Sequence, residues 1–263
     1  MQNIDDNLYK ESTPIMNITY KNHTLRIDCN EIGFSKRDVE AISRIGHSSK
    51  SELGSKSSYV GAKGIGFKSV FKVSDVAWIY SGEYSFKFDK TERLGMVAPI
   101  WADFPGKRLP GFTSILLQLS QDCDVQNLIR EVKAIHPKLL IFLRRLKEVN
   151  IEIFGNDHTP WKTTLRRQDT ICRSDRLKSV TLERDNYSSS YVLFRHPIFN
   201  LSHDPKRGDS EQSEILLAFP LNEKGEPHSE PQDVYAFLPI RDYGFKVWPP
   251  LNGQLKFRKL TSV

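Results

Sequence analysis

The run from Gly61 to Ser69 most restricts how this chain can fold, because it places three glycines in a GxxGxG spacing ahead of an apolar turn. Glycine has no Cβ atom, so backbone N–H groups in such a run can converge on an anion. The residues after it, Lys68 to Ile79, predict that the loop continues into the start of a helix, whose free N–H groups favour phosphate. The run therefore predicts a phosphate-binding loop.

Two familiar glycine loops do not fit this register. A P-loop requires Lys directly after the glycine that lies five residues beyond the first, and Phe67 holds that place. Dinucleotide and kinase loops require GxGxxG, and counting from Gly64 the third glycine position is Ser69. The alternative is a solvated surface loop, because Gly, Ser and Lys dominate residues 46–66.

A second motif lies upstream, in residues 27–34 with the sequence IDCNEIGF. Alternation at Leu25 and Ile27 predicts a strand that ends near Asp28. An aspartate at a strand end can accept a hydrogen bond from an exocyclic amine, and in a partly apolar pocket that bond discriminates well between ligands. The alternative is an ordinary turn in water.

A third motif lies near the N-terminus, where amide and charged side chains recur at the spacing of one helical face: Asn3, Asp6, Asn7 and Lys10. Such a polar stripe can hold hydrated Mg²⁺, whose octahedral shell takes oxygen ligands together with phosphate. The alternative is a helix face in water.

Taken together, the three segments in this order resemble the GHKL ATPases, the superfamily of gyrase, MutL, histidine kinases and the ninety-kilodalton heat-shock chaperone. The sharpest resemblance is to the sacsin and NO VEIN-like branch, whose boxes are similar to residues 2–9, 28–34 and 59–71. The stretch from Gly33 to Gly46 and the late segments 235–240 and 242–245 are also similar to that branch. The resemblance covers residues 1 to about 246.

The resemblance implies a role for each motif in binding ATP and Mg²⁺. Asn3 would support Mg²⁺, with Asp6, Asn7 and Lys10 on the same face, and Asp28 would receive the adenine amine. Gly33 and Phe34 would line the adenine slot, and Thr113 would help to fix the base through water. Residues 46–60 would form a lid that orders on binding, and the phosphates would be wrapped by Gly61, Lys63, Gly64, Ile65, Gly66 and Phe67.

One feature of the superfamily is missing from this sequence. The first box of the superfamily, which residues 2–9 resemble, is called the N-box. The general base of the superfamily is a glutamate four residues before the N-box asparagine, and in this chain that position lies ahead of residue 1. We therefore expect nucleotide binding without efficient hydrolysis and name no catalytic residue. We also expect both ends of the chain to be truncated or eroded.

The order of predicted elements favours an α/β fold, a two-layer α+β sandwich of the Bergerat type, followed by a partial, β-rich, transducer-like domain. The expected domains are residues 1–150 and 151–263. Ser35 and Asp38 predict a capped helix that ends at Gly46, and Ser81-Gly82-Glu83 predicts the turn of a hairpin between Val73 and Phe88. Further helices are predicted at 125–135 and 139–143, and strands at 114–119, 149–153, 190–194, 215–219 and 234–238, with long surface loops at 202–213 and 222–233.

Composition limits the class of protein. Mean hydropathy is −0.46, and no apolar run approaches the roughly 18 residues of a membrane span. Three cysteines without a CxxC pattern argue against a zinc site or a disulfide framework. Together with the absence of a visible secretory leader, they favour an intracellular location. The net charge of +6 permits an anionic partner. Nucleic acid is a disfavoured partner, because the basic clusters, such as Arg166-Arg167, lack interleaved aromatic residues.

Two functional classes remain open at the level of sequence. The favoured one is a nucleotide-dependent conformational module of a larger chaperone-like or regulatory protein, with an adenine nucleotide and protein clients as partners. The other is a pseudo-ATPase domain kept for binding a protein or nucleic acid.

Overall fold

The computed structural model describes residues 1–10, 12–43, 66–155, 159–174, 177–200, 213–226, 231–236, 238–247 and 257–259. They form two compact units, the first made of Met1–Ile135 with Arg144–Thr164 and the second of His136–Leu143 with Leu165–Val263. The fold is of the α/β type, with a large mixed sheet and few helices among these residues. No described helix is both long enough and apolar enough to cross a membrane.

The first unit is built on a mixed sheet with the strand order β7-β1-β2-β6-β3-β4-β5. Neighbours pair antiparallel except β1 and β7, which run parallel. The strands are β1 (Ile15–Lys21), β2 (Thr24–Cys29), β3 (Ser74–Ser81), β4 (Tyr84–Asp89), β5 (Ile100–Trp101), β6 (Thr113–Leu119) and β7 (Glu148–Ile153).

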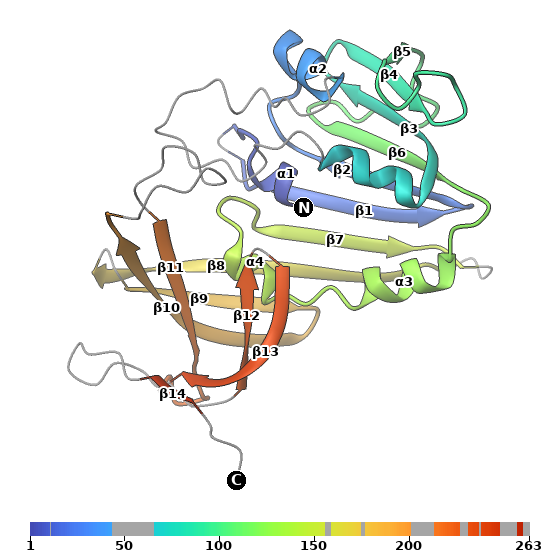
Figure 1. Ribbon diagram of the computed structural model, residues 1–263. Helices are drawn as coiled ribbons and strands as arrows, with labels where there is room; N and C mark the ends of the chain where they lie inside the picture. The colour runs from blue at the N-terminus through green and yellow to red at the C-terminus, as the bar shows by residue number, and fades with distance from the viewer. Residues whose placement is uncertain are drawn as a thin grey trace. The chain divides into compact units, whose positions relative to one another are not determined.

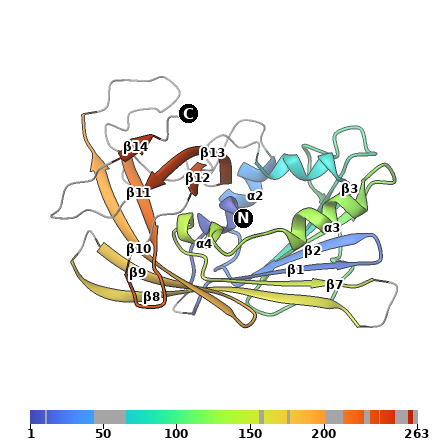
Figure 2. The same ribbon diagram turned by 90° about the horizontal axis from the view of Figure 1, so that it is seen from below.

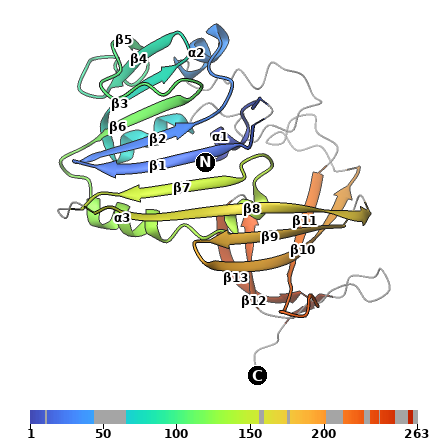
Figure 3. The same cartoon turned by 180° about the vertical axis from the view of Figure 1, so that it is seen from behind.

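Helices lie against one face of this sheet. Figures 1 and 2 show α1 (Gln2–Asp5), the 3₁₀ helix η2 (Phe67–Lys72) and α3 (Val125–Lys133) on the same side of the strands, and Figure 3 shows the strands from the opposite side. The described part of this unit also contains α2 (Lys36–Ser43). We call the covered side the helix-covered face.

Strand alternation explains which side chains fill the space between the layers. The helix-covered face carries the buried apolar members of the ladder, among them Met16, Ile18, Ala77, Ile79, Phe86, Phe88, Leu117, Val149 and Ile151. Residues one step along each strand point to the other face and are more polar. The unit therefore has one apolar core between a helical layer and a sheet.

Several local predictions are confirmed. The N–H and Oγ of Ser35 donate to the Asp38 carboxylate at 2.8 and 2.6 Å, the reciprocal bond of a capping box at the start of α2. The predicted hairpin is β3–β4, with Gly82 at a positive φ of 59° in its turn. The strand at 114–119, the helix at 125–135 and the strand at 149–153 correspond to β6, α3 and β7.

The helix predicted along residues 3–10 is wrong in extent, because α1 ends at Asp5. Tertiary contacts replace helical bonds beyond that point. Tyr9 forms a β-bridge with Glu31, and the Arg145 guanidinium donates hydrogen bonds to the carbonyl oxygens of Asp6 and Asn7. Asp6, Asn7 and Lys10 therefore do not share a helix face with Asn3.

The second unit is rich in strands, as predicted. Its first sheet has the order β11-β10-β9-β8, all antiparallel, and a three-stranded sheet has the order β12-β13-β14. The elements are α4 (Leu139–Phe142), β8 (Trp161–Ser174, which begins in the first unit), β9 (Leu177–Arg184), β10 (Tyr187–Ile198), β11 (Ser213–Pro220), β12 (Pro231–Ala236), β13 (Leu238–Val247) and β14 (Phe257–Lys259).

Candidate functional site

The first and third predicted motifs meet at Asn3 and Gly66. A Cβ atom added to Gly66 would lie 3.2 Å from Nδ2 and 3.4 Å from Oδ1 of Asn3. Gly66 has an ordinary right-handed φ of −59°, so glycine is needed here for close approach and not for backbone conformation. Directly after it, η2 begins, and its Phe67 ring packs on Phe88 of β4 at 5.6 Å between centroids. The start of η2 is thereby fixed to the helix-covered face.

The second motif is bound to the same N-terminal segment. The N–H of Ile32 donates to the carbonyl of Leu8 at 3.0 Å, and Tyr9 pairs with Glu31 in the β-bridge. Three stretches that are separate in sequence therefore come together around residues 3–9.

Gly33 and Phe34 pass beside a pair of buried hydroxyl groups. The N–H of Phe34 donates to Ser81 Oγ at 2.8 Å, and a Cβ atom on Gly33, whose φ is +91°, would lie 3.4 Å from the same oxygen. Ser81 Oγ lies 2.6 Å from Thr113 Oγ1, in a hydrogen bond that either hydroxyl can donate. Ser81 therefore links Thr113 to the backbone of Phe34.

Asp28 is not part of this group. Its carboxylate accepts from Arg26 Nε at 2.8 and 2.9 Å and from the Ser114 hydroxyl, its cross-strand neighbour on β6. Cys29 is the residue that pairs with Thr113, so Asp28 points to the opposite face of the sheet. The segment between β5 and β6 contacts that face, where the Lys107 carbonyl accepts from Arg26. The position of Asp28 gives no support to its predicted contact with adenine.

Cys29 faces the N-terminal segment and is chemically quiet. Its side chain is buried, its Sγ lies 3.2 Å from the Tyr9 hydroxyl, and Tyr9 Oη also donates to the Ile4 carbonyl at 2.8 Å. Burial raises the pKa of the Cys29 thiol to about 11 and also raises the pKa of the Tyr9 phenol. Cys29 is therefore better described as a small buried hydrophobe than as a reactive thiol.

The remaining predicted residues divide into two groups. In the N-terminal segment, Asp6 is buried and Lys10 is exposed to solvent. The lid at 46–60 and four members of the glycine run, Gly61, Lys63, Gly64 and Ile65, lie outside the described residues. Among the described residues, no group of three or more His, Cys, Asp and Glu side chains has metal-binding geometry.

Comparison with known proteins supports the branch that the motifs resemble. Residues 13–98 match the model of the Sacsin domain. The chain is also 30% identical, over 275 aligned positions, to the Protein NO VEIN of Arabidopsis thaliana. This chain is similar to the sacsin and NO VEIN-like proteins. The alignment covers 94% of this chain but only 9% of Protein NO VEIN, so the likeness concerns one part of a much longer protein.

Ser81 was missed as a candidate site residue at the sequence level. Ser81 stood only as a turn residue of the β3–β4 hairpin, although its cross-strand position opposite Thr113 brings it to Gly33. Strand parity was the available signal. In an antiparallel ladder, partners share a face and sequence neighbours do not.

Proposed function

We propose that the first unit binds an adenine nucleotide with Mg²⁺ on the helix-covered face, as a GHKL-type module with a Bergerat-like two-layer fold. The observation that carries the proposal is the contact between the Asn3 amide and Gly66. It joins the N-box to the end of the glycine run, where a triphosphate and its cation would have to meet. The likeness to the sacsin and NO VEIN-like proteins supports the same reading.

At the phosphate end, Gly66 leaves room that a side chain would fill, and the Asn3 oxygen lies beside that room. Mg²⁺ keeps several waters and takes only one or two protein oxygens besides phosphate. One amide oxygen is therefore a sufficient protein contribution. In this proposal Asn3 orients a hydrated cation.

At the base end, the proposal relies on Gly33, Phe34, Ser81 and Thr113. The two hydroxyl groups share one hydrogen bond, so one of their two protons has no acceptor among the described residues. Both side chains are buried, at 0% and 4% exposure, and an unused buried donor is unfavourable. A base nitrogen, reached directly or through water, would accept that proton. Asp28 has no part in this arrangement.

We also propose a wider role, which rests on the resemblance of the sequence motifs to the GHKL ATPases. The unit would be the nucleotide-dependent conformational module of a larger chaperone-like or regulatory protein, and the β-rich second unit would correspond to a transducer-like region. Coupling of this kind requires that the nucleotide make different contacts in two states of the protein.

Nucleotide titration of the full chain tests the proposal. Wild-type protein is expected to bind MgATP. Gly66→Ala, which adds a methyl group against Asn3 without changing φ, is expected to weaken binding at least tenfold. Thr113→Val, which removes one hydroxyl, is expected to weaken it about 3- to 10-fold.

Asp28→Asn is the matched control, because it alters a buried polar residue at the same end of the sheet but on the other face. It is expected to leave affinity unchanged. Absence of binding to the wild-type protein at millimolar MgATP would overturn the proposal and leave the pseudo-ATPase interaction domain as the better reading. A loss confined to Asp28→Asn would move the site to the opposite face.

A further inference from the structure

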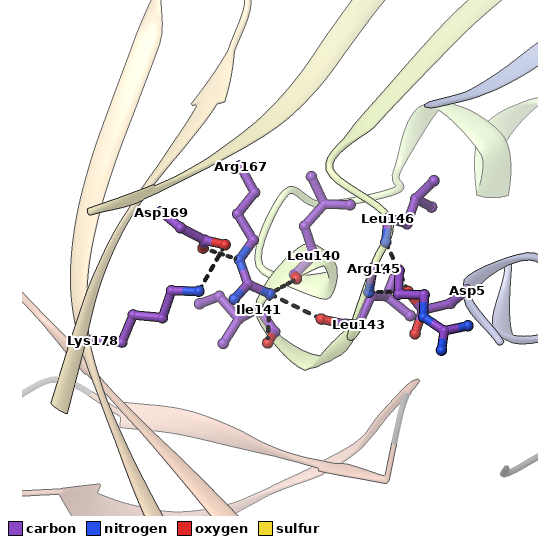
Figure 4. A network of polar contacts seen from close by, with 9 residues as sticks. All are labelled: Asp5, Leu140, Ile141, Leu143, Arg145, Leu146, Arg167, Asp169 and Lys178. Atoms are coloured by element: carbon purple, nitrogen blue, oxygen red, sulfur yellow. Dashed lines mark hydrogen bonds and ion pairs between the residues drawn. The ribbon is translucent and has the colours of Figure 1, made fainter. Parts of the chain in front are cut away.

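The carboxylate of Asp5 is held by backbone N–H groups from a distant part of the chain. It accepts from the N–H of Arg144 at 2.7 Å. It also accepts from the N–H groups of Arg145 and Leu146, at 2.8 Å each (Figure 4). Asp5 is only 4% exposed. A carboxylate that is buried this deeply needs such donors, since charge-assisted bonds offset the loss of its hydration.

Arg145 completes the contact in the opposite direction. Its Nη1 donates to the carbonyl oxygens of Asp6 and Asn7. These five hydrogen bonds join residues 5–7 to residues 144–146. The carboxylate belongs to the first of these segments and the guanidinium to the second. We call this set the N-box lock.

The partner segment is firmly attached to the sheet. Leu146 is fully buried, and the N–H groups of Lys147 and Glu148 donate to the Pro14 carbonyl at 3.0 and 3.2 Å. The strand β7 follows directly and pairs with β1 along its whole length. The lock thus ties the N-terminal segment to the frame of the first unit.

The helix that carries Asn3 cannot hold its own position. α1 has four residues, and a helix of about one turn is unstable in isolation. Asn3 lies two residues before Asp5, so the anchor of Asp5 sets where the Asn3 amide stands relative to Gly66. A further polar contact of α1 is the hydrogen bond from the Tyr9 hydroxyl to the Ile4 carbonyl.

We propose that Asp5 and Arg145 are positioning residues that hold Asn3 against Gly66. Neither side chain would touch the bound nucleotide. Their effect on ligand binding rests on the proposed function, whereas their effect on the distance between residues 3 and 66 does not.

Disulfide trapping measures that distance without any ligand. Cysteines placed as Asn3→Cys and Gly66→Cys in the full chain are expected to cross-link under mild oxidation. Adding Asp5→Asn, which keeps the size of the side chain but turns an NH₂ group toward N–H donors, is expected to slow cross-linking at least tenfold. Asp103→Asn is the matched control, since the Asp103 side chain is 98% exposed, and it is expected to have no effect.

A second variant guards against misfolding of the first. Arg145→Lys keeps the charge but loses the forked donor, and we expect cross-linking to slow several-fold. Arg108→Lys, in the exposed pair with Asp103, is its control. All rates are measured well below the unfolding midpoint of each variant, with the parent chain and its native cysteines as the blank. Cross-linking that is unchanged in both lock variants would overturn the inference.

The nucleotide measurement then separates positioning from general weakening of the fold. If Asp5 acts through Asn3, Asp5→Asn should lower affinity for MgATP about tenfold and change affinity for metal-free adenosine little. An equal loss for both ligands would show a purely structural role and contradict the inference. If wild-type protein bound no nucleotide, the proposed function would fail, while the cross-linking rates would still decide the role of Asp5.

Discussion

The surroundings of Lys68 do not suit a positive charge. Its Nζ is buried, lies 3.6 Å from the centroid of the Phe88 ring, and has no hydrogen-bond acceptor among the described residues. Desolvation lowers the pKa of Lys68 to about 8. The contact with the aromatic face recovers part of the lost hydration energy. The positive charge of Lys68, close after the glycine run, is therefore only partly compensated for its loss of hydration.

Replacing this lysine is expected to stabilise the protein at neutral pH. Because the pKa of Lys68 is lower in the folded chain than in the unfolded chain, the unfolded chain holds the extra proton between about pH 8 and pH 10.5. The unfavourable effect is thus fully present below pH 8 and fades as pH rises through that window. Lys68→Met should have a higher unfolding free energy than wild type at pH 7, with a difference that shrinks towards pH 10.

Urea unfolding at pH 7, 8, 9 and 10 measures this difference. Lys72→Met, which changes an exposed lysine of the same 3₁₀ helix, is the control and should show no such trend. A stability difference for Lys68→Met that stays constant with pH would rule out a depressed pKa at this site.

At this scale the sequence named candidate residues but not the directions of their side chains. Gly33, Phe34, Thr113 and Gly66 were named from motifs, and the structure places the first three around Ser81 and the last against Asn3. Asp28 was named in the same way but faces the other side of the sheet. A single step along a strand reverses the direction of a side chain, and the motif spacing contained no information on register.

At the scale of elements, the sequence predicted those helix ends and turns that depend only on neighbouring residues. The capping box of α2 and the Gly82 turn depend on residues within a few positions of one another, and both were predicted. α1 was overestimated because its end is set by residues 144–146, more than a hundred positions away. Long-range contacts of this kind override helix propensity.

The end of α4 is also set from a distance, by Arg167 on β8. Arg167 is 5% exposed, and its Nη1 donates to the carbonyl oxygens of Leu140, Ile141 and Leu143 at 2.7, 3.2 and 2.9 Å (Figure 4). Its Nε donates to Asp169 at 2.7 Å, and Asp169 also pairs with Lys178. One side chain thereby satisfies carbonyl groups that a helix end leaves open.

Arg167→Leu is expected to destabilise the second unit by about 3 kcal/mol or more, because buried carbonyls and a carboxylate lose a charged donor together. Arg195→Leu is the matched control on the same sheet. Its pair with Glu214 is about half exposed on both sides and is expected to contribute less than about 1 kcal/mol. Denaturant unfolding of the full chain compares the two. Equal losses would mean that the Arg167 bonds contribute no more than a surface pair.

At the scale of the whole molecule, the chain crosses between its two units more than once. Residues 136–143 belong to the second unit, and Arg144–Thr164 return to the first. A division at a single point after residue 150 would cut through β7, whose Ile151 and Ile153 are buried in the sheet of the first unit. Composition and loop signals could not reveal this arrangement, because it depends on which distant residues hold α4.

Two fragments of the chain test this division. Residues 1–164 contain the first unit together with α4, but lack Arg167 and the sheet of the second unit. The apolar side chains of Leu140, Ile141 and Leu143, each at most 3% exposed in the folded chain, would then lack the rest of their unit. We expect this fragment to bind a hydrophobic dye and to associate, since exposed apolar patches favour both.

The second fragment also spans residues 1–164, but a Gly/Ser linker of the same length replaces residues 136–143. It keeps Arg144 to Leu146, and with them the N-box lock, while the apolar helix is gone. It should be monomeric, bind little dye and unfold in one cooperative transition, because the sheet from β7 to β5 and its helical layer are retained. Dye binding, light scattering and thermal unfolding of the two fragments, measured side by side, provide the comparison. Association of the linker fragment to the same degree as the unaltered one would show that the first unit depends on more of the second than α4, and the division of the chain drawn here would be wrong.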